Sequence, residues 1–164
     1  MSCKIPQEIL EYIELVESDN PRACPEQHAL VDHIRKCFAE EDLTVDLHQL
    51  EKYMGLQRYF PFQLFPWQKF VIALWDCTYT PDGMPRWDTF FGMVARGAGK
   101  DGLIAFDSAC SISPYCESPR YDVDICANDA DNQNLLFAIL HVNTSFYFFI
   151  GSPMIVLQLY SIMY

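Results

Sequence analysis

The stretch Phe90-Phe91-Gly92-Met93-Val94-Ala95-Arg96-Gly97-Ala98-Gly99-Lys100-Asp101-Gly102-Leu103-Ile104-Ala105 decides the fold predicted for this chain. An apolar run ends in a short glycine-rich loop, a lysine follows, and a second apolar stretch begins. This order is typical of a strand, a phosphate-binding loop and a helix. Glycines let backbone N–H groups turn toward an anion, and the start of the helix adds a partial positive charge.

The loop departs from the usual pattern G-x-x-x-x-G-K-[ST] at two positions. Val94 stands where the first glycine is expected, and Asp101 stands where a Ser or Thr hydroxyl would coordinate Mg²⁺. In this interpretation Lys100 supplies the charge for the β- and γ-phosphates. Asp101 can itself ligate Mg²⁺, but it adds negative charge beside the phosphates. We therefore expect weak or altered nucleotide binding.

Working outward, the fold class predicted is α/β: an incomplete parallel sheet of the P-loop NTPase type, preceded by a helical N-terminal segment. Apolar residues at helical spacing predict helices over residues 6–18, Pro25 to about Glu40, and Asp46–Met54. A helix from Pro66, a turn at Pro81-Asp82-Gly83, a helix from Lys100 to about Cys110 and a strand over Tyr121–Ala127 follow. We divide the chain into residues 1–59, 60–131 and 132–164.

Bulk composition limits the classes of function. The 164 residues carry a net charge of −11 without any run of Lys or Arg, so the chain has no general attraction to DNA or anionic lipid. The seven cysteines are odd in number and show no disulfide framework. Together with the absence of a signal peptide, this favours a reducing, cytosolic setting.

Two clusters of metal-binding residue types carry less weight. Cys24, His28, His33 and Cys37 have the composition of a zinc site. At a rise of 1.5 Å per residue, however, the two cysteines would lie roughly 20 Å apart on one helix, too far to share an ion. Asp122 and Asp124 would face one side of a strand and could hold Mg²⁺ through water, but an exposed strand face is the simpler interpretation.

Residues 132–164 differ in character from the rest, because they contain no Asp, Glu, Lys or Arg. Three interpretations remain open. The stretch from Phe146 to Met163 nearly reaches the length of a membrane-spanning helix, but Gly151, Pro153 and Gln158 weaken it. The tail could also form buried strands. We favour the third, a tail unrelated to the rest that arises from a shifted reading frame or a broken gene.

Three short sequence motifs, in the same order along the chain, resemble the N-terminal part of the packaging ATPase in the large terminase subunit of tailed bacteriophages. They are Pro66-Trp67-Gln68, the loop Ala95–Lys100 and the strand Asp124–Asn128. The resemblance covers roughly residues 25–133. It implies a P-loop ATPase that drives DNA into a procapsid, with a separate nuclease domain, and hence ATP and Mg²⁺ as cofactors. Phage DNA, the small terminase subunit and the portal are the implied partners, and the host cytoplasm is the implied location.

The resemblance also implies roles for individual residues. Gln68 matches a glutamine near the adenine pocket, although a surface amide on an amphipathic helix is the simpler alternative. Arg96 matches an arginine that senses the γ-phosphate. The phosphate cradle corresponds to Gly97, Ala98, Gly99, Lys100 and Asp101, with Asp101 as a candidate Mg²⁺ ligand.

Other parts of that family's machinery are missing. No apolar strand ending in Asp-Glu follows Lys100, so we identify no catalytic residue, and the nuclease domain has no counterpart. The sequence therefore predicts a truncated, ATP-binding piece of a packaging motor, such as a prophage remnant, without turnover or nuclease activity. The alternative is a small membrane-associated or partner-binding protein in which Gly-x-Gly-Lys is coincidental.

Overall fold

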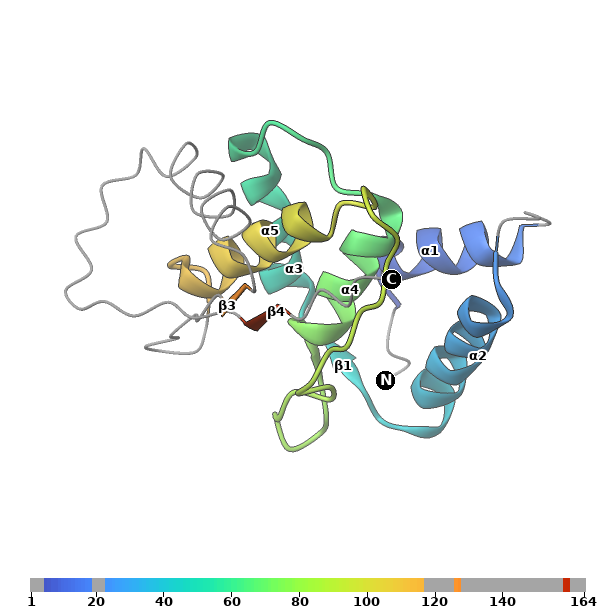
Figure 1. The fold of residues 1–164 in the computed structure, drawn as a ribbon. Coiled ribbons are helices and arrows are strands. Elements are labelled where there is room, and N and C mark those ends of the chain that lie inside the picture. The colour runs from blue at the N-terminus through green and yellow to red at the C-terminus, as the bar shows by residue number, and fades with distance from the viewer. Residues whose placement is uncertain (1–4, 19–22, 117–125, 128–157, 160–164) are drawn as a thin grey trace. The chain divides into compact units, whose positions relative to one another are not determined.

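A computed structural model describes residues 5–18, 23–116, 126–127 and 158–159 of the chain. Most of this part is helical (Figure 1). The elements, in chain order, are α1 (Gln7–Glu17), α2 (Pro25–Glu40), β1 (Thr44–Val45), α3 (Leu47–Gly55), a 3-10 helix (Leu56–Tyr59), α4 (Pro66–Trp75), β2 (Thr78–Tyr79), α5 (Lys100–Ile112), β3 (Cys126–Ala127) and β4 (Gln158–Leu159).

The predicted α/β fold with a parallel P-loop sheet is wrong. Strands β1 and β2 form a two-stranded antiparallel sheet in which Thr44 is opposite Tyr79 and Val45 is opposite Thr78. Strands β3 and β4 pair in parallel, but each is only two residues long. No strand forms at Phe90–Ala95, where the first strand of the P-loop unit was expected. Apolar composition alone cannot make a strand, which also needs a neighbouring strand for its backbone hydrogen bonds.

The helices predicted from apolar spacing are confirmed. Helix α2 has the predicted bounds, α1 and α3 differ from theirs by one residue at each end, and α5 starts as predicted and ends two residues later. The predicted turn at residues 81–83 is also present, where Gly83 takes a φ of 80° and its N–H donates to Thr80 C=O at 2.9 Å. Of the strand predicted over Tyr121–Ala127, the structure describes only Cys126–Ala127.

The chain divides into two compact units. One comprises Met1–Glu51 and Leu64–Met93, and the other comprises Lys52–Gln63 and Val94–Tyr164. The division into residues 1–59, 60–131 and 132–164 stays a prediction. Residues 132–164 lie outside the described part of the chain except for β4. Among the residues that the structure does describe, no helix combines the length and the apolar character needed to cross a membrane.

The core of the first unit forms where α1 packs against α4. Helix α1 buries Ile9, Tyr12, Ile13 and Val16, which recur every three or four residues and therefore share one face. The ring of Tyr12 lies 4.3 Å, between centroids, from that of Phe70 on α4. Helix α4 is buried almost throughout, from Phe70 to Leu74. This burial gives α4 its stability in the absence of a large sheet.

In the second unit, α5 packs against aromatic residues that follow the 3-10 helix. The ring centroids of Phe60 and Phe106 are 5.1 Å apart, and Phe106 is fully buried. Gly102 lets α5 approach Phe62 closely, because a Cβ at that position would lie 3.2 Å from the Phe62 ring. These contacts hold the helix whose first residues belong to the predicted phosphate loop.

Candidate functional site

The predicted phosphate loop is a tight turn that leads directly into α5. Gly97 and Gly99 have φ values of 82° and 88°, in the left-handed region that residues with a Cβ rarely adopt. Between them, Ala98 donates its N–H to Ala95 C=O at 3.1 Å. Gly99 is the N-cap of α5. The two glycines are thus required by the shape of this turn.

The first turn of α5 carries backbone donors that the helix itself does not use. The first intrahelical bond runs from Leu103 N–H to Gly99 C=O at 3.0 Å, so the N–H groups of Lys100, Asp101 and Gly102 precede it. Such groups, with the positive end of the helix dipole, attract anions. A glycine turn, a helix start and a lysine therefore occur together, as the sequence predicts.

The charged residues of the loop are arranged less favourably for an anion. Lys100 Nζ lies 3.1 Å from Asp101 Oδ1, with side chains 44% and 39% exposed. An exposed pair of this kind contributes only about 0–1 kcal/mol to stability. It nevertheless places a carboxylate next to the ammonium group that would meet a phosphate. Arg96 is exposed, and it forms no hydrogen bond or ion pair with any residue in the described ranges.

Gln68 belongs to the first unit, whereas the loop belongs to the second. Its side chain is 2% exposed, so the surface-amide alternative is wrong. Gln68 is the third residue of α4, and its Oε1 accepts a hydrogen bond from Phe65 N–H at 2.7 Å. This bond satisfies one of the backbone donors that a helix start leaves unpaired.

The start of α2 repeats this arrangement. Pro25 and Gln27 occupy the first and third helical positions, as Pro66 and Gln68 do in α4. The Gln27 Oε1 accepts a bond from Cys24 N–H at 3.0 Å. The sequence x-Pro-x-Gln thus forms the same cap at two helix starts, only one of which has a predicted nucleotide role. Capping is therefore a sufficient structural reason for Gln68.

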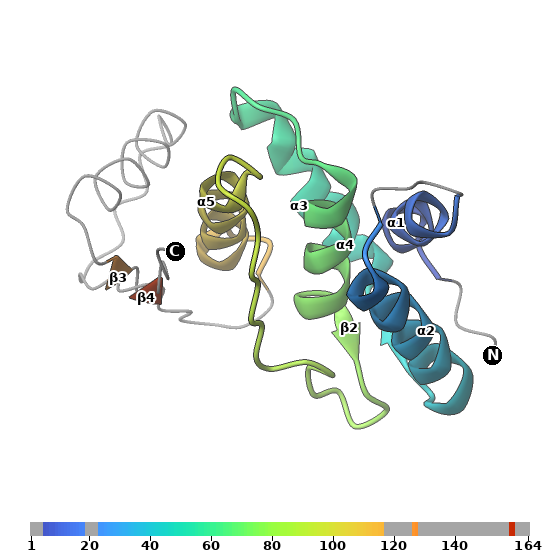
Figure 2. The same cartoon turned by 45° about the vertical axis from the view of Figure 1, so that its right-hand side comes forward.

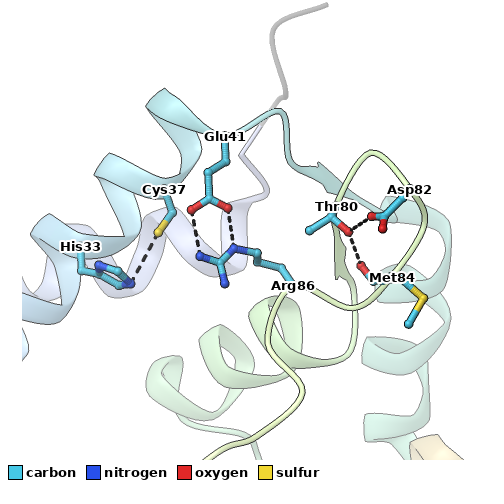
Figure 3. Close-up of polar contacts among 7 residues, drawn as sticks. All are labelled: His33, Cys37, Glu41, Thr80, Asp82, Met84 and Arg86. Atoms are coloured by element: carbon cyan, nitrogen blue, oxygen red, sulfur yellow. Dashed lines mark hydrogen bonds and ion pairs between the residues drawn. The ribbon is translucent and has the colours of Figure 1, made fainter.

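A second polar cluster was not predicted from the sequence (Figure 3). Arg86 Nε and one terminal nitrogen of its guanidinium donate to the two carboxylate oxygens of Glu41 at 2.5 and 2.9 Å. The hydrogen bond from Arg86 holds the pKa of Glu41 below its usual range. Next to this pair, Cys37 Sγ lies 3.5 Å from His33 Nε2. The four-residue spacing of His33, Cys37 and Glu41, at the end of α2, is visible in the sequence, but a partner 45 residues away is not.

This cluster is suited to holding the chain together rather than to catalysis. Burial, and then the neighbouring Glu41, raise the pKa of the Cys37 thiol, so the thiol stays protonated at neutral pH. A protonated thiol is a poor nucleophile even with a histidine beside it. Arg86 instead ties the loop after β2 to the end of α2, and the same loop is braced by Thr80, whose hydroxyl bonds to Asp82 and to Met84 C=O.

No protein-family model, curated protein or solved structure matches this chain. The resemblance to terminases therefore depends on the quoted residues alone. Within the described residues, no three His, Cys, Asp or Glu side chains gather into a group that could hold a metal ion. Asp101 stays a predicted Mg²⁺ ligand, and Asp122 and Asp124 lie outside the described residues.

Proposed function

We propose that the segment Ala95–Asp101 binds the phosphates of ATP, weakly, as part of a protein related to the ATPase of phage DNA-packaging motors. The observation that supports this most is the pair of left-handed glycines, Gly97 and Gly99, directly before a thirteen-residue helix whose first residue is Lys100. Turns of this kind let backbone N–H groups converge on an anion. Arg96 and Lys100 add two positive charges to the same short segment.

The proposal does not include hydrolysis by this chain alone, because no catalytic glutamate is identified. Mg²⁺ would reach the site with ATP, and Asp101 is the carboxylate nearest to it in sequence. A contact between Gln68 and adenine stays a proposal by resemblance only, since this buried side chain caps α4. Phage DNA, the small terminase subunit and the portal, all in the host cytoplasm, remain proposed partners by resemblance only.

Asp101 should weaken binding through repulsion. Two like unit charges 4 Å apart repel by about 4 kcal/mol at an effective dielectric constant of 20, before a metal ion offsets part of this. The carboxylate also competes with phosphate for Lys100, since the two side chains already form an ion pair. Replacing Asp101 with serine removes both effects and supplies the hydroxyl of the usual pattern.

Calorimetric titration of the full chain with Mg-ATP tests the proposal. We expect Lys100→Ala to weaken binding at least about tenfold, since a hydrogen bond to a charged group contributes about 1.5–3 kcal/mol. We expect Asp101→Ser to tighten binding about tenfold. Lys36→Ala and Asp42→Ser are matched controls, because they change the same charges at exposed positions outside the loop. Equal affinities for Lys100→Ala and Lys36→Ala, or tighter binding by the parent than by Asp101→Ser, would contradict the proposal.

One observation favours the partner-binding alternative. Phe91 and Met93, directly before the loop, are 82% and 86% exposed, which is unusual for two large apolar side chains so close in sequence. In that alternative the Gly-x-Gly-Lys turn serves only to start α5. Mg-ATP would then give no heat of binding with the parent chain or with Asp101→Ser. Membrane association, the other form of the alternative, would leave the expressed chain in the pellet after carbonate extraction.

A further inference from the structure

The nine residues Asp88–Arg96, which we call the connecting segment, could form backbone hydrogen bonds with another strand. The segment contains no helix or strand, and it is part of the uncoiled stretch of chain that joins β2 to α5 in Figure 2. Within the described residues, no backbone N–H or C=O from Asp88 to Val94 has a backbone hydrogen-bond partner. An uncoiled run with free backbone groups and exposed apolar side chains is a template for adding another strand.

Two copies of the connecting segment have complementary side chains when they run antiparallel to each other. In an antiparallel pair centred on Gly92, Asp88 of one chain lies opposite Arg96 of the other, and Phe91 lies opposite Met93. Each of these pairs occurs twice because of the two-fold symmetry. Opposite charges and aromatic contacts directly across strands stabilise such pairing, and sulfur against an aromatic ring is also favourable.

Other alignments lose these matches. A parallel pairing in register sets Asp88 beside Asp88 and Arg96 beside Arg96, and like charges across strands are destabilising. A shift by one residue sends every side chain to the opposite face. Phe90 is already held within its own chain, where its ring centroid lies 5.6 Å from that of Trp75. In the paired strand, neighbouring residues would point to opposite faces, so Phe91 and Met93 would point away from the side of Phe90.

We propose that two copies of this chain associate by antiparallel pairing of their connecting segments around Gly92. The charges at the two ends of the segment select a second copy as the occupant and set the register. The contact is short, well below the area of about 1,200–2,000 Å² that stable interfaces bury. The dimer is therefore weak and reversible, and it forms only at high protein concentration. Both chains are strongly acidic, so added salt reduces their mutual repulsion and favours association.

Sedimentation velocity of the full chain without nucleotide, over a range of concentrations, tests this proposal. Asp88→Arg alone sets two arginines against each other at both ends of the pair, and Arg96→Asp alone sets two aspartates against each other. Each variant should associate at least about tenfold more weakly than the parent. An equimolar mixture of the two variants restores both opposite-charge pairs, so it should form a mixed dimer at least as tight as the parent dimer.

Charge reversals outside the connecting segment provide matched controls. Glu40→Lys and Lys36→Glu make the same changes in net charge at the exposed ends of an ion pair on α2. They should leave no preference for a mixed dimer. Circular dichroism confirms that all variants keep their helices, so a loss of association cannot be due to unfolding.

Three results would overturn the proposal. A parent chain that stays monomeric at several hundred micromolar has no such pairing. A dimer that is indifferent to both reversals in the connecting segment uses another surface. Assembly that continues past the dimer is not a closed two-fold pair. Because nucleotide is absent, none of these outcomes bears on ATP binding at the loop.

Discussion

Replacing Gln68 with alanine separates the capping role of this residue from its proposed contact with adenine. In the structure the side chain is buried, and its Oε1 accepts the Phe65 N–H bond at the start of α4. Loss of a helix-start cap costs about 0.5–2 kcal/mol. Removal of a buried methylene adds about 0.8 kcal/mol, before any cavity term. We therefore expect Gln68→Ala to lower the free energy of unfolding by about 1–3 kcal/mol.

The matched control is Gln27→Ala at the start of α2. Gln27 makes the same cap with Cys24 N–H, and its Nε2 also donates to the Tyr12 hydroxyl at 3.2 Å. Its side chain is only partly buried. We therefore expect a loss of about 1 kcal/mol, mostly from the cap itself. Urea unfolding followed by circular dichroism gives both values, with the slope of the transition checking that the denatured states are comparable.

The stability argument is refuted if Gln68→Ala is no more destabilising than Gln27→Ala. The proposed contact with adenine is tested with a second variant, Gln68→Glu. This variant keeps an oxygen acceptor for Phe65 N–H but removes the amide donor that an adenine edge requires. If the proposed adenine contact exists, this variant loses preference for ATP over GTP, and the Gln27→Glu control does not. Unchanged preference in both variants would contradict the proposed contact of Gln68 with adenine.

Three further predictions follow from other contacts. Above the usual pKa of a glutamate, the ion pair of Glu41 with Arg86 stabilises the fold. This stabilisation is lost as the pH falls through the lowered pKa of Glu41. Glu41→Gln should therefore lose less stability than the parent when the pH is lowered below about 4, as measured by urea midpoints. Gly97→Ala and Gly83→Ala should each cost about 1–2 kcal/mol, because both positions have φ near 80° and open space around them, but only Gly97→Ala should weaken Mg-ATP binding. The buried thiol of Cys37 should resist alkylation until the chain unfolds, when peptide mass mapping will detect its label.

The helices could be predicted from the sequence because the information for them is local. Apolar residues three or four apart form one face, as Ile9, Ile13 and Val16 do in α1. Proline at the first helical position fixed the starts of α2 and α4 as predicted. The turn at Gly97 and Gly99 was predictable for the same reason, since only glycine takes positive φ at little cost.

The features that failed or were missed depend on residues far apart in the chain. The run Phe90–Ala95 has the composition of a buried strand, but a strand exists only beside a partner, and residues in the described ranges provide none. The pairing of Glu41 with Arg86 was missed because nothing in either local sequence indicates the other. The burial of Gln68 likewise depends on the packing of α4 as a whole.

The weight of the terminase resemblance shifts once the structure is considered. Pro66-Trp67-Gln68 loses much of its value as a nucleotide motif, because Pro25-Glu26-Gln27 forms the same cap at α2. The strand before the loop is absent from the described residues, and Asp124 lies outside them. The turn from Ala95 to Lys100 is different, since capping a helix does not require two left-handed glycines with a lysine after them. An N-cap of Ser, Thr, Asp or Asn would start α5 at least as well as Gly99. The case for nucleotide binding therefore depends on this one turn, and the comparison of Gly97→Ala with Gly83→Ala tests it most directly.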